Sequence, residues 1–157
     1  MATLTSTITE SISLNGADRG STNALTIASV TQVFHRIVTC PTGQDTTLAT
    51  FASVADDSAV SGSLDVEDVK YIRVTNLDST NPVNLSLQVD AGEDDSAADE
   101  SATLLLAAGR SFVMGAPSDG VAVSDADATL IDVLHNLESI LIDPLSNAVT
   151  VEVFIAS

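Results

Sequence analysis

The chain has few positive charges and few aromatic rings. Its 157 residues include 22 Asp or Glu against five Lys or Arg, with a formal net charge of −17, and they contain four Phe, one Tyr and no Trp. Nucleic acids and anionic membranes are bound by basic patches, so this balance argues against direct binding to either. The shortage of aromatics argues against sugar stacking and predicts a core of Val, Leu, Ile and Ala.

Cysteine is also scarce. The single cysteine, Cys40, excludes an intrachain disulfide and a cysteine-based zinc site. It ends an apolar stretch before Pro41, and the sequence places no histidine or acid beside it, so we interpret it as a free, partly buried thiol rather than a nucleophile. No apolar run approaches the roughly 18 residues of a transmembrane helix, and the first residues are polar, so we expect neither a signal peptide nor a membrane anchor.

Alternating apolar residues predict two clear β-strands. Apolar side chains occupy every second position in two segments: Val83, Leu85, Leu87 and Val89, and then Val149, Val151, Val153 and Ile155. This period of two is typical of half-buried strands. Another strand is predicted from Tyr71 to Val74, followed by turn residues such as Asp78 and Pro82. We therefore predict a β-hairpin from Tyr71 to Val89.

Further strand-like segments are separated by polar turns. They cover residues 25–40, 47–54 and 101–114. The segment 129–143 fits either a helix or two short strands joined at His135–Asn136, and we favour the strands. Eight or more short strands without a long amphipathic helix predict an all-β fold, namely an antiparallel β-sandwich of jelly-roll type formed by residues 21–157.

Residues 1–20 are predicted to form an N-terminal strand or extended arm. Apolar residues recur at even positions among Ser and Thr in this segment: Leu4, Ile8, Ile12 and Leu14. A sandwich has edge strands that natural proteins cover, so the arm can cover an edge or add a strand to a neighbouring subunit. Arg73 and Lys70 are two of the few cations, and we expect each to meet a carboxylate within the subunit or across an interface. The predicted interface residues are Leu4, Ile8, Ile12 and Arg73.

Two acidic clusters raise the possibility of calcium binding. The segment 90–100 holds Asp90, Glu93, Asp94, Asp95, Asp99 and Glu100, and Asp125 and Asp127 form a smaller pair. Hard cations bind clustered carboxylates, but the spacing does not match an EF-hand loop, so we interpret both clusters as solvated charge runs.

Neither histidine nor serine forms a recognisable catalytic or metal-binding motif. His35 and His135 can meet only through the fold, and each is interpreted as structural. No Gly-x-Ser-x-Gly elbow, phosphate-binding glycine loop or His-Glu-x-x-His motif occurs. We therefore assign no catalytic, cofactor-binding or metal-ligating residue, and expect the protein not to be an enzyme.

Three segments in the C-terminal half resemble a known family. The segments Tyr71–Asp78, Leu105–Gly115 and Val151–Ala156 look like parts of small virion structural proteins of tailed phages, especially those of marine and cyanobacterial hosts. The resemblance implies a β-sandwich subunit of the head, as a decoration protein, or of the tail. It also implies that the subunit packs against major capsid or tail proteins, without cofactor or catalysis. A homo-oligomer, with a trimer as the specific expectation, would be made in the host cytoplasm and end in the virion.

Together with this resemblance, the sequence leads us to expect a non-enzymatic structural subunit of a phage virion. The alternative is a calcium- or carbohydrate-binding β-sandwich module, and a third possibility is a small jelly-roll enzyme. Detection of the protein in purified virions separates the first from the others.

Overall fold

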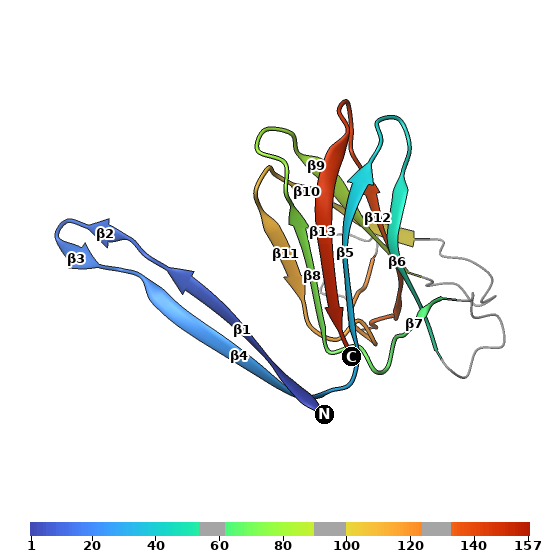
Figure 1. Cartoon of the computed structure of the whole chain (residues 1–157), viewed down its shortest axis with the longest axis horizontal. Coiled ribbons are helices and arrows are strands. Elements are labelled where there is room, and N and C mark those ends of the chain that lie inside the picture. Colours follow the sequence, from blue (N-terminus) through green and yellow to red (C-terminus); the bar gives the residue numbers. More distant parts are fainter. Residues whose placement is uncertain (54–61, 90–99, 124–132) are drawn as a thin grey trace.

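The computed structural model is all-β and describes residues 1–53, 62–89, 100–123 and 133–157. The part outside the arm is a sandwich of two sheets (Figure 1). One sheet has the order β11-β8-β13-β5 and the other β10-β9-β12-β6-β7. Its strands are β5 (Val33–Cys40), β6 (Thr46–Ala52), β7 (Leu64–Asp65), β8 (Tyr71–Asn76), β9 (Val83–Val89), β10 (Glu100–Leu106), β11 (Ser111–Met114), β12 (Leu137–Asp143) and β13 (Val149–Ala156). Among the described residues no helix is long and apolar enough to cross a membrane.

The strand order is that of a jelly roll. The first strand of the sandwich, β5, pairs with the last, β13, and the second, β6, pairs with β12. Between them in the sequence, β8 pairs with β11 and β9 pairs with β10. These pairs are antiparallel, and short β7 alone adds a parallel partner to β6. The predicted antiparallel, jelly-roll-like β-sandwich is therefore confirmed.

The core consists of the alternating apolar residues that the sequence marks. Along β9 the four residues Val83, Leu85, Leu87 and Val89 are buried, whereas the intervening residues are half-buried. Val149, Val151, Val153 and Ile155 of β13 are buried in the facing layer. Cys40 is fully buried at the end of β5, and burial raises the pKa of its thiol, so it is a core residue.

The predicted hairpin from Tyr71 to Val89 is wrong in one respect: β8 and β9 are both strands, but they belong to different sheets. The chain between them passes from one sheet to the other as an arch at the end of the sandwich. Buried Asn76 fixes this crossing, because its Nδ2 donates to the carbonyl oxygens of Asn81 and Leu106 at 2.9 and 3.2 Å. Asp78 then accepts hydrogen bonds from the backbone N–H groups of Thr80 and Asn81 at 2.7 Å each. Turn chemistry was visible in the sequence, whereas the choice of pairing partner depends on distant strands.

The N-terminal segment forms a long two-stranded arm that projects from the sandwich (Figure 1). In it β1 (Ala2–Glu10) pairs antiparallel with β4 (Ser21–Val30), and β2 (Ser13–Leu14) pairs with β3 (Ala17–Asp18) around Asn15 and Gly16. Both turn residues have positive φ, 52° and 76°, as a tight hairpin turn requires. The arm therefore runs to Val30 rather than to residue 20, and the predicted strand region 25–40 divides into β4 of the arm and β5 of the sandwich.

The remaining predictions divide between described and undescribed residues. Within the segment 129–143, β12 begins at Leu137, and His135 forms a bridge with Val121, so the described part is strand rather than helix. Residues 90–99, Asp125 and Asp127 lie outside the described residues, and with them most of the predicted acidic loop.

Candidate functional site

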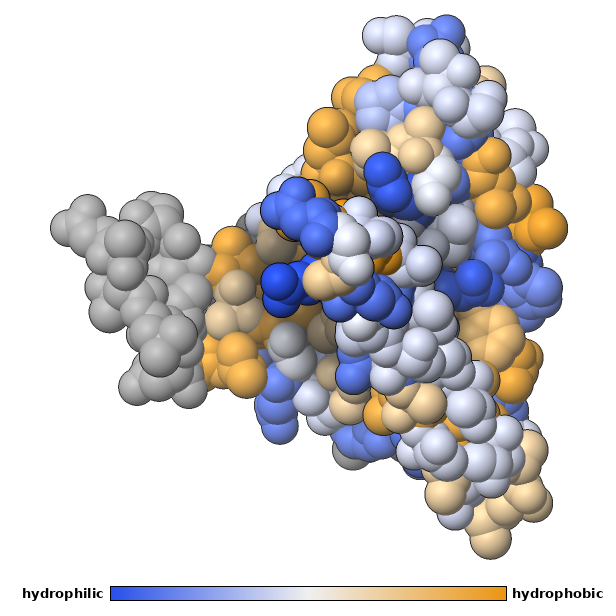
Figure 2. Space-filling view, turned by 90° about the vertical axis from the view of Figure 1, so that its left-hand side faces the viewer, coloured by the Kyte–Doolittle hydropathy of each residue, from blue (hydrophilic) through white to orange (hydrophobic). Residues whose placement is uncertain are grey.

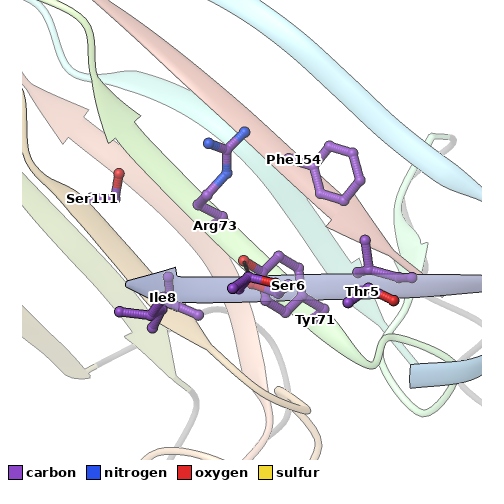
Figure 3. A pocket seen from close by; sticks show the side chains of 10 residues that line it. Thr5, Ser6, Ile8, Tyr71, Arg73, Ser111 and Phe154 are labelled. Carbon is purple, nitrogen blue, oxygen red and sulfur yellow. Dashed lines mark hydrogen bonds between the residues drawn. The ribbon is translucent and has the colours of Figure 1, made fainter. Parts of the chain in front are cut away.

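The root of the arm packs on one end of the sandwich. Buried Val30, Tyr71 and Ala156 form a small apolar cluster, and Leu4, Ile27 and Phe154 pack against it. The hydroxyl oxygens of Ser6 on β1 and Tyr71 on β8 lie 3.1 Å apart, close enough for one to donate to the other (Figure 3). These contacts join the first residues of the arm to the outer face of the β11-β8-β13-β5 sheet.

Hydrogen bonds hold the link between the arm and the sandwich. The backbone N–H groups of Thr31 and Gln32 donate to the carbonyl oxygen of Ser157 at 2.6 and 3.1 Å, and the Ser157 N–H donates back to Gln32 at 3.1 Å. Lys70 Nζ donates to the carbonyl oxygen of Ser29 at 2.8 Å. The arm is therefore attached to the sandwich by specific hydrogen bonds at its root. Within the subunit Lys70 therefore meets a backbone carbonyl, and the expectation that it meets a carboxylate across an interface stays a prediction.

A cleft opens where the arm diverges from the sheet. It has a volume of about 450 Å³. Its lining residues come from β1, β8, β11 and β13: Leu4, Thr5, Ser6, Thr7, Ile8, Tyr71, Arg73, Ser111, Val113 and Phe154. Figure 3 shows β1 crossing in front of the sheet, with the side chains of Arg73 and Phe154 on the strands behind it. The cleft combines apolar walls with hydroxyl groups and one cation, which suits contact with another polypeptide.

Glu152 contacts two nitrogen-bearing side chains on the outer face of the β11-β8-β13-β5 sheet. Its two carboxylate oxygens each lie 2.8 Å from a nitrogen, one from Arg73 and the other from His35 Nε2. The Arg73 guanidinium also lies 5.9 Å from the centre of the Phe154 ring. Arg73 therefore meets a carboxylate within its own subunit, as one of the two sequence-based alternatives proposed. Held by Glu152, it presents a fixed side chain at the wall of the cleft.

The two faces of the arm differ in polarity. The register of β1 and β4 pairs Leu4 with Ile27, Ser6 with Leu25 and Ile8 with Asn23, so one face, called the apolar face below, carries the large apolar side chains together with some polar ones. The other face carries threonine pairs such as Thr9 with Thr22. Beyond the root the apolar face is uncovered, with Ile8 at 55% and Leu25 at 51% exposure. Figure 2, viewed from the side towards which the arm projects, shows hydrophobic groups in separate patches among polar residues.

The arm is almost uncharged. It contains Glu10, Asp18 and Arg19, a formal net charge of −1, so −16 of the chain's −17 resides in the other residues. The arm is therefore the part of the molecule that another copy can approach with the least electrostatic repulsion.

The structure brings three of the four predicted interface residues into one site. Leu4, Ile8 and Arg73 line the cleft, whereas Ile12 lies beyond β1 in the outer arm, where its side chain is exposed. The sequence did not identify Tyr71 and Phe154 as site residues, although both line the cleft at the root of the arm. It also missed β4 as the partner of β1. Asn15-Gly16 between two Thr-rich segments was a usable hairpin signal.

Other chemistry is sparse in the part of the chain that the structure describes. No group of three or more His, Cys, Asp and Glu residues there is placed to hold a metal ion. A polar hollow of about 240 Å³ lies on the other sheet. It is lined by Asp45, Asn84, Ser86, Gln88, Thr103, Leu141 and Asp143.

Comparisons with known proteins give no family. No protein-family model and no curated protein matches the chain. A solved structure described as "Bacillus endospore appendages form a novel family of disulfide-linked pili" aligns at 18% identity with a TM-score of 0.34, covering 82% of this chain and 88% of that one. Similarity at this level carries no functional argument, so the function is argued from the geometry.

Proposed function

We propose that this protein is a non-enzymatic structural subunit that assembles through its N-terminal arm, and that the assembly is the virion of a tailed phage. One observation carries the proposal: a rigidly rooted two-stranded arm projects from the sandwich with its apolar face half exposed. Exposed apolar groups and unpaired strand edges on a projecting ribbon favour association.

The charge distribution supports assembly through the arm. Subunits that each carry −17 repel one another, and at physiological ionic strength this repulsion is screened over about 8 Å. Contacts between copies are therefore most favourable where the local charge is small. The arm is such a region, and the acidic remainder of each subunit is left to face the medium.

A matched pair of variants tests assembly through the arm. Ile8 and Thr9 are neighbours on β1 whose side chains point to opposite faces of the ribbon, and both are exposed. Ile8→Asp places a charge on the apolar face, whereas Thr9→Asp places the same charge on the threonine face. We expect Ile8→Asp to weaken self-association in sedimentation velocity and Thr9→Asp to leave it nearly unchanged. Equal behaviour of the two variants contradicts a contact through the apolar face.

The virion location requires its own test. Mass spectrometry of purified virions from a host that produces the protein should detect it at a constant ratio to the major capsid protein. Its absence from such particles, with assembly through the arm retained, leaves a structural subunit of another assembly.

A carbohydrate-binding module is the second candidate, and the polar hollow on the β10-β9-β12-β6-β7 sheet favours it. Asn84 donates to Asp143 there at 3.3 Å, and such amide–carboxylate pairs also bind sugar hydroxyls. The described lining residues include no aromatic ring for stacking. Glycan binding that is lost in Asn84→Ala and retained in Ile8→Asp would support this function over the first.

A further inference from the structure

The β5 strand is an open edge of the sandwich. It pairs with β13 over its full eight residues without a register shift. On its other side no strand pairs with it among the described residues. A regular strand of this length presents a row of unpaired backbone N–H and C=O groups and is a template for a further strand.

The side chains of β5 protect this edge only through Arg36. Val33 and Ile37 are 54% and 63% exposed, and the strand contains no proline and no acidic residue. It carries His35, which contacts Glu152 of the neighbouring β13, and Arg36, whose guanidinium lies over the Phe34 ring, so β5 itself contributes no negative charge. The other edges differ: β11 has four residues, β7 has two, and β10 begins with Glu100.

The arm supplies an uncharged strand that is long enough to pair with β5. β4 spans ten residues, Ser21–Val30, and none of them is charged. One side of β4 pairs with β1, and the other side has no strand partner in the described part of the chain. At about 3.3 Å per residue, β4 is long enough to cover the whole of β5.

The arm does not cover β5 of its own subunit. Only Thr31 and Gln32 separate β4 from β5, and both are held by Ser157. The chain departs from the sandwich at this point, so β4 and β5 lie in different sheets and diverge (Figure 1). Among the described residues, no strand of the same molecule is placed to pair with the free edge of β5.

We propose that β4 in the arm of one copy pairs with the free edge of β5 in a second copy, which extends the four-stranded sheet by the two long strands of the arm. This inference rests on the proposed function and names the partner surface. The contact is between different surfaces of the two copies, so it repeats from copy to copy and closes into a ring or continues as a filament. The expected trimer is one ring of this kind.

Two edge residues of equal exposure test the contact. Ile37 on β5 and Leu105 on β10 are each 63% exposed and lie on edge strands of opposite sheets. Lysine on an edge strand opposes further pairing. We expect Ile37→Lys to weaken self-association about tenfold or more in sedimentation velocity, and Leu105→Lys to behave like the parent protein.

Hydrogen–deuterium exchange gives a direct readout of pairing. In the assembled parent, peptides covering residues 21–30 and 33–40 should both exchange more slowly than in the dilute protein. In Ile37→Lys both should lose this concentration-dependent protection, whereas the core peptide 83–89 should not change. Circular dichroism of each variant confirms that the sandwich is intact.

The outcomes separate the two proposals. If Ile8→Asp prevents self-association but Ile37→Lys does not, assembly through the arm stands and β5 is not the partner surface. Equal weakening by Ile37→Lys and Leu105→Lys also overturns the β5 contact. If the parent does not self-associate and its 33–40 peptide is protected only by a different virion protein, the second copy is the wrong occupant.

Discussion

Ser6 and Tyr71 are 65 residues apart in the sequence, and their hydroxyl oxygens meet 3.1 Å apart at the root of the arm. Tyr71 is buried by this contact and by the apolar cluster around it, although it belongs to a strand face that otherwise points outwards. The pair therefore couples the direction of the arm to the sandwich, and it can be tested without disturbing the core.

Removal of the Tyr71 hydroxyl should loosen the arm root. Tyr71→Phe keeps the ring and loses one hydrogen bond, so we expect a loss of about 0.5–1.5 kcal/mol in unfolding free energy. Faster hydrogen exchange in residues 2–10 should accompany it. Ser6→Ala serves as the second edge of a double-mutant cycle, and additive effects of the two changes would show that the hydroxyls do not interact.

Core burial along β9 predicts unequal effects of neighbouring substitutions. Leu85 is fully buried, whereas the adjacent Ser86 is half-buried on the opposite face. Leu85→Ala should cost about 2–5 kcal/mol because it leaves a cavity, and Ser86→Ala well under about 1 kcal/mol. Urea unfolding monitored by circular dichroism measures both. Similar costs would contradict the burial pattern of β9.

The arch between β8 and β9 should contribute a pH-dependent term to stability. Hydrogen bonds from the backbone N–H groups of Asn81 and Thr80 lower the pKa of the Asp78 carboxyl. Because the folded-state pKa is lower than the unfolded one, near 3.9, this stabilisation is present at neutral pH and is lost as pH falls below about 4 through the lowered pKa. Asp78→Ala should therefore destabilise the protein more at pH 7 than at the acid limit.

A non-titrating variant controls the Asp78 experiment. Asp78→Asn keeps an acceptor oxygen without a titrating group, so its stability relative to Asp78→Ala should change little with pH. Thermal melts of the three proteins across the acid range provide the comparison. A parent-to-alanine difference that is constant with pH would exclude the proposed role of the carboxylate.

Local patterns predicted the strands but not their partners. The period of two along β9 and β13 reflects the pleat of each strand and its one buried side, so burial of Leu85 and Val151 was readable from the sequence. Pairing is non-local. After β8 the chain passes to the other sheet, and hydrogen bonds from Asn76 to Asn81 and Leu106 stabilise this passage. Such a change of sheet leaves no periodic signal in the sequence.

The candidate site was likewise predictable only as far as local sequence patterns define it. The alternation of Leu4 and Ile8 identified the apolar face of the arm, and the scarcity of cations singled out Arg73. The cleft itself depends on the angle between the arm and the sheet. Ser157 holds that angle through Thr31 and Gln32, which are more than a hundred residues away from it in sequence, so Tyr71 and Phe154 could not be assigned to the site beforehand.

Deletion of the arm should leave a folded sandwich that no longer assembles. The main core begins at Cys40 and includes no residue of the arm, so removal of residues 1–30 should preserve a β-rich circular dichroism spectrum. It should also uncover Tyr71 and Phe154 and abolish self-association in sedimentation velocity.

Deletion of Thr3–Leu14 alone is the informative comparison, because it removes β1 and leaves β4 without its partner. The shorter deletion should aggregate through the exposed β4 edge, whereas the longer one should be monomeric. If the protein lacking residues 1–30 assembles and binds virions like the full chain, the arm is not the interface, and the contact must lie on the sheet face around Arg73.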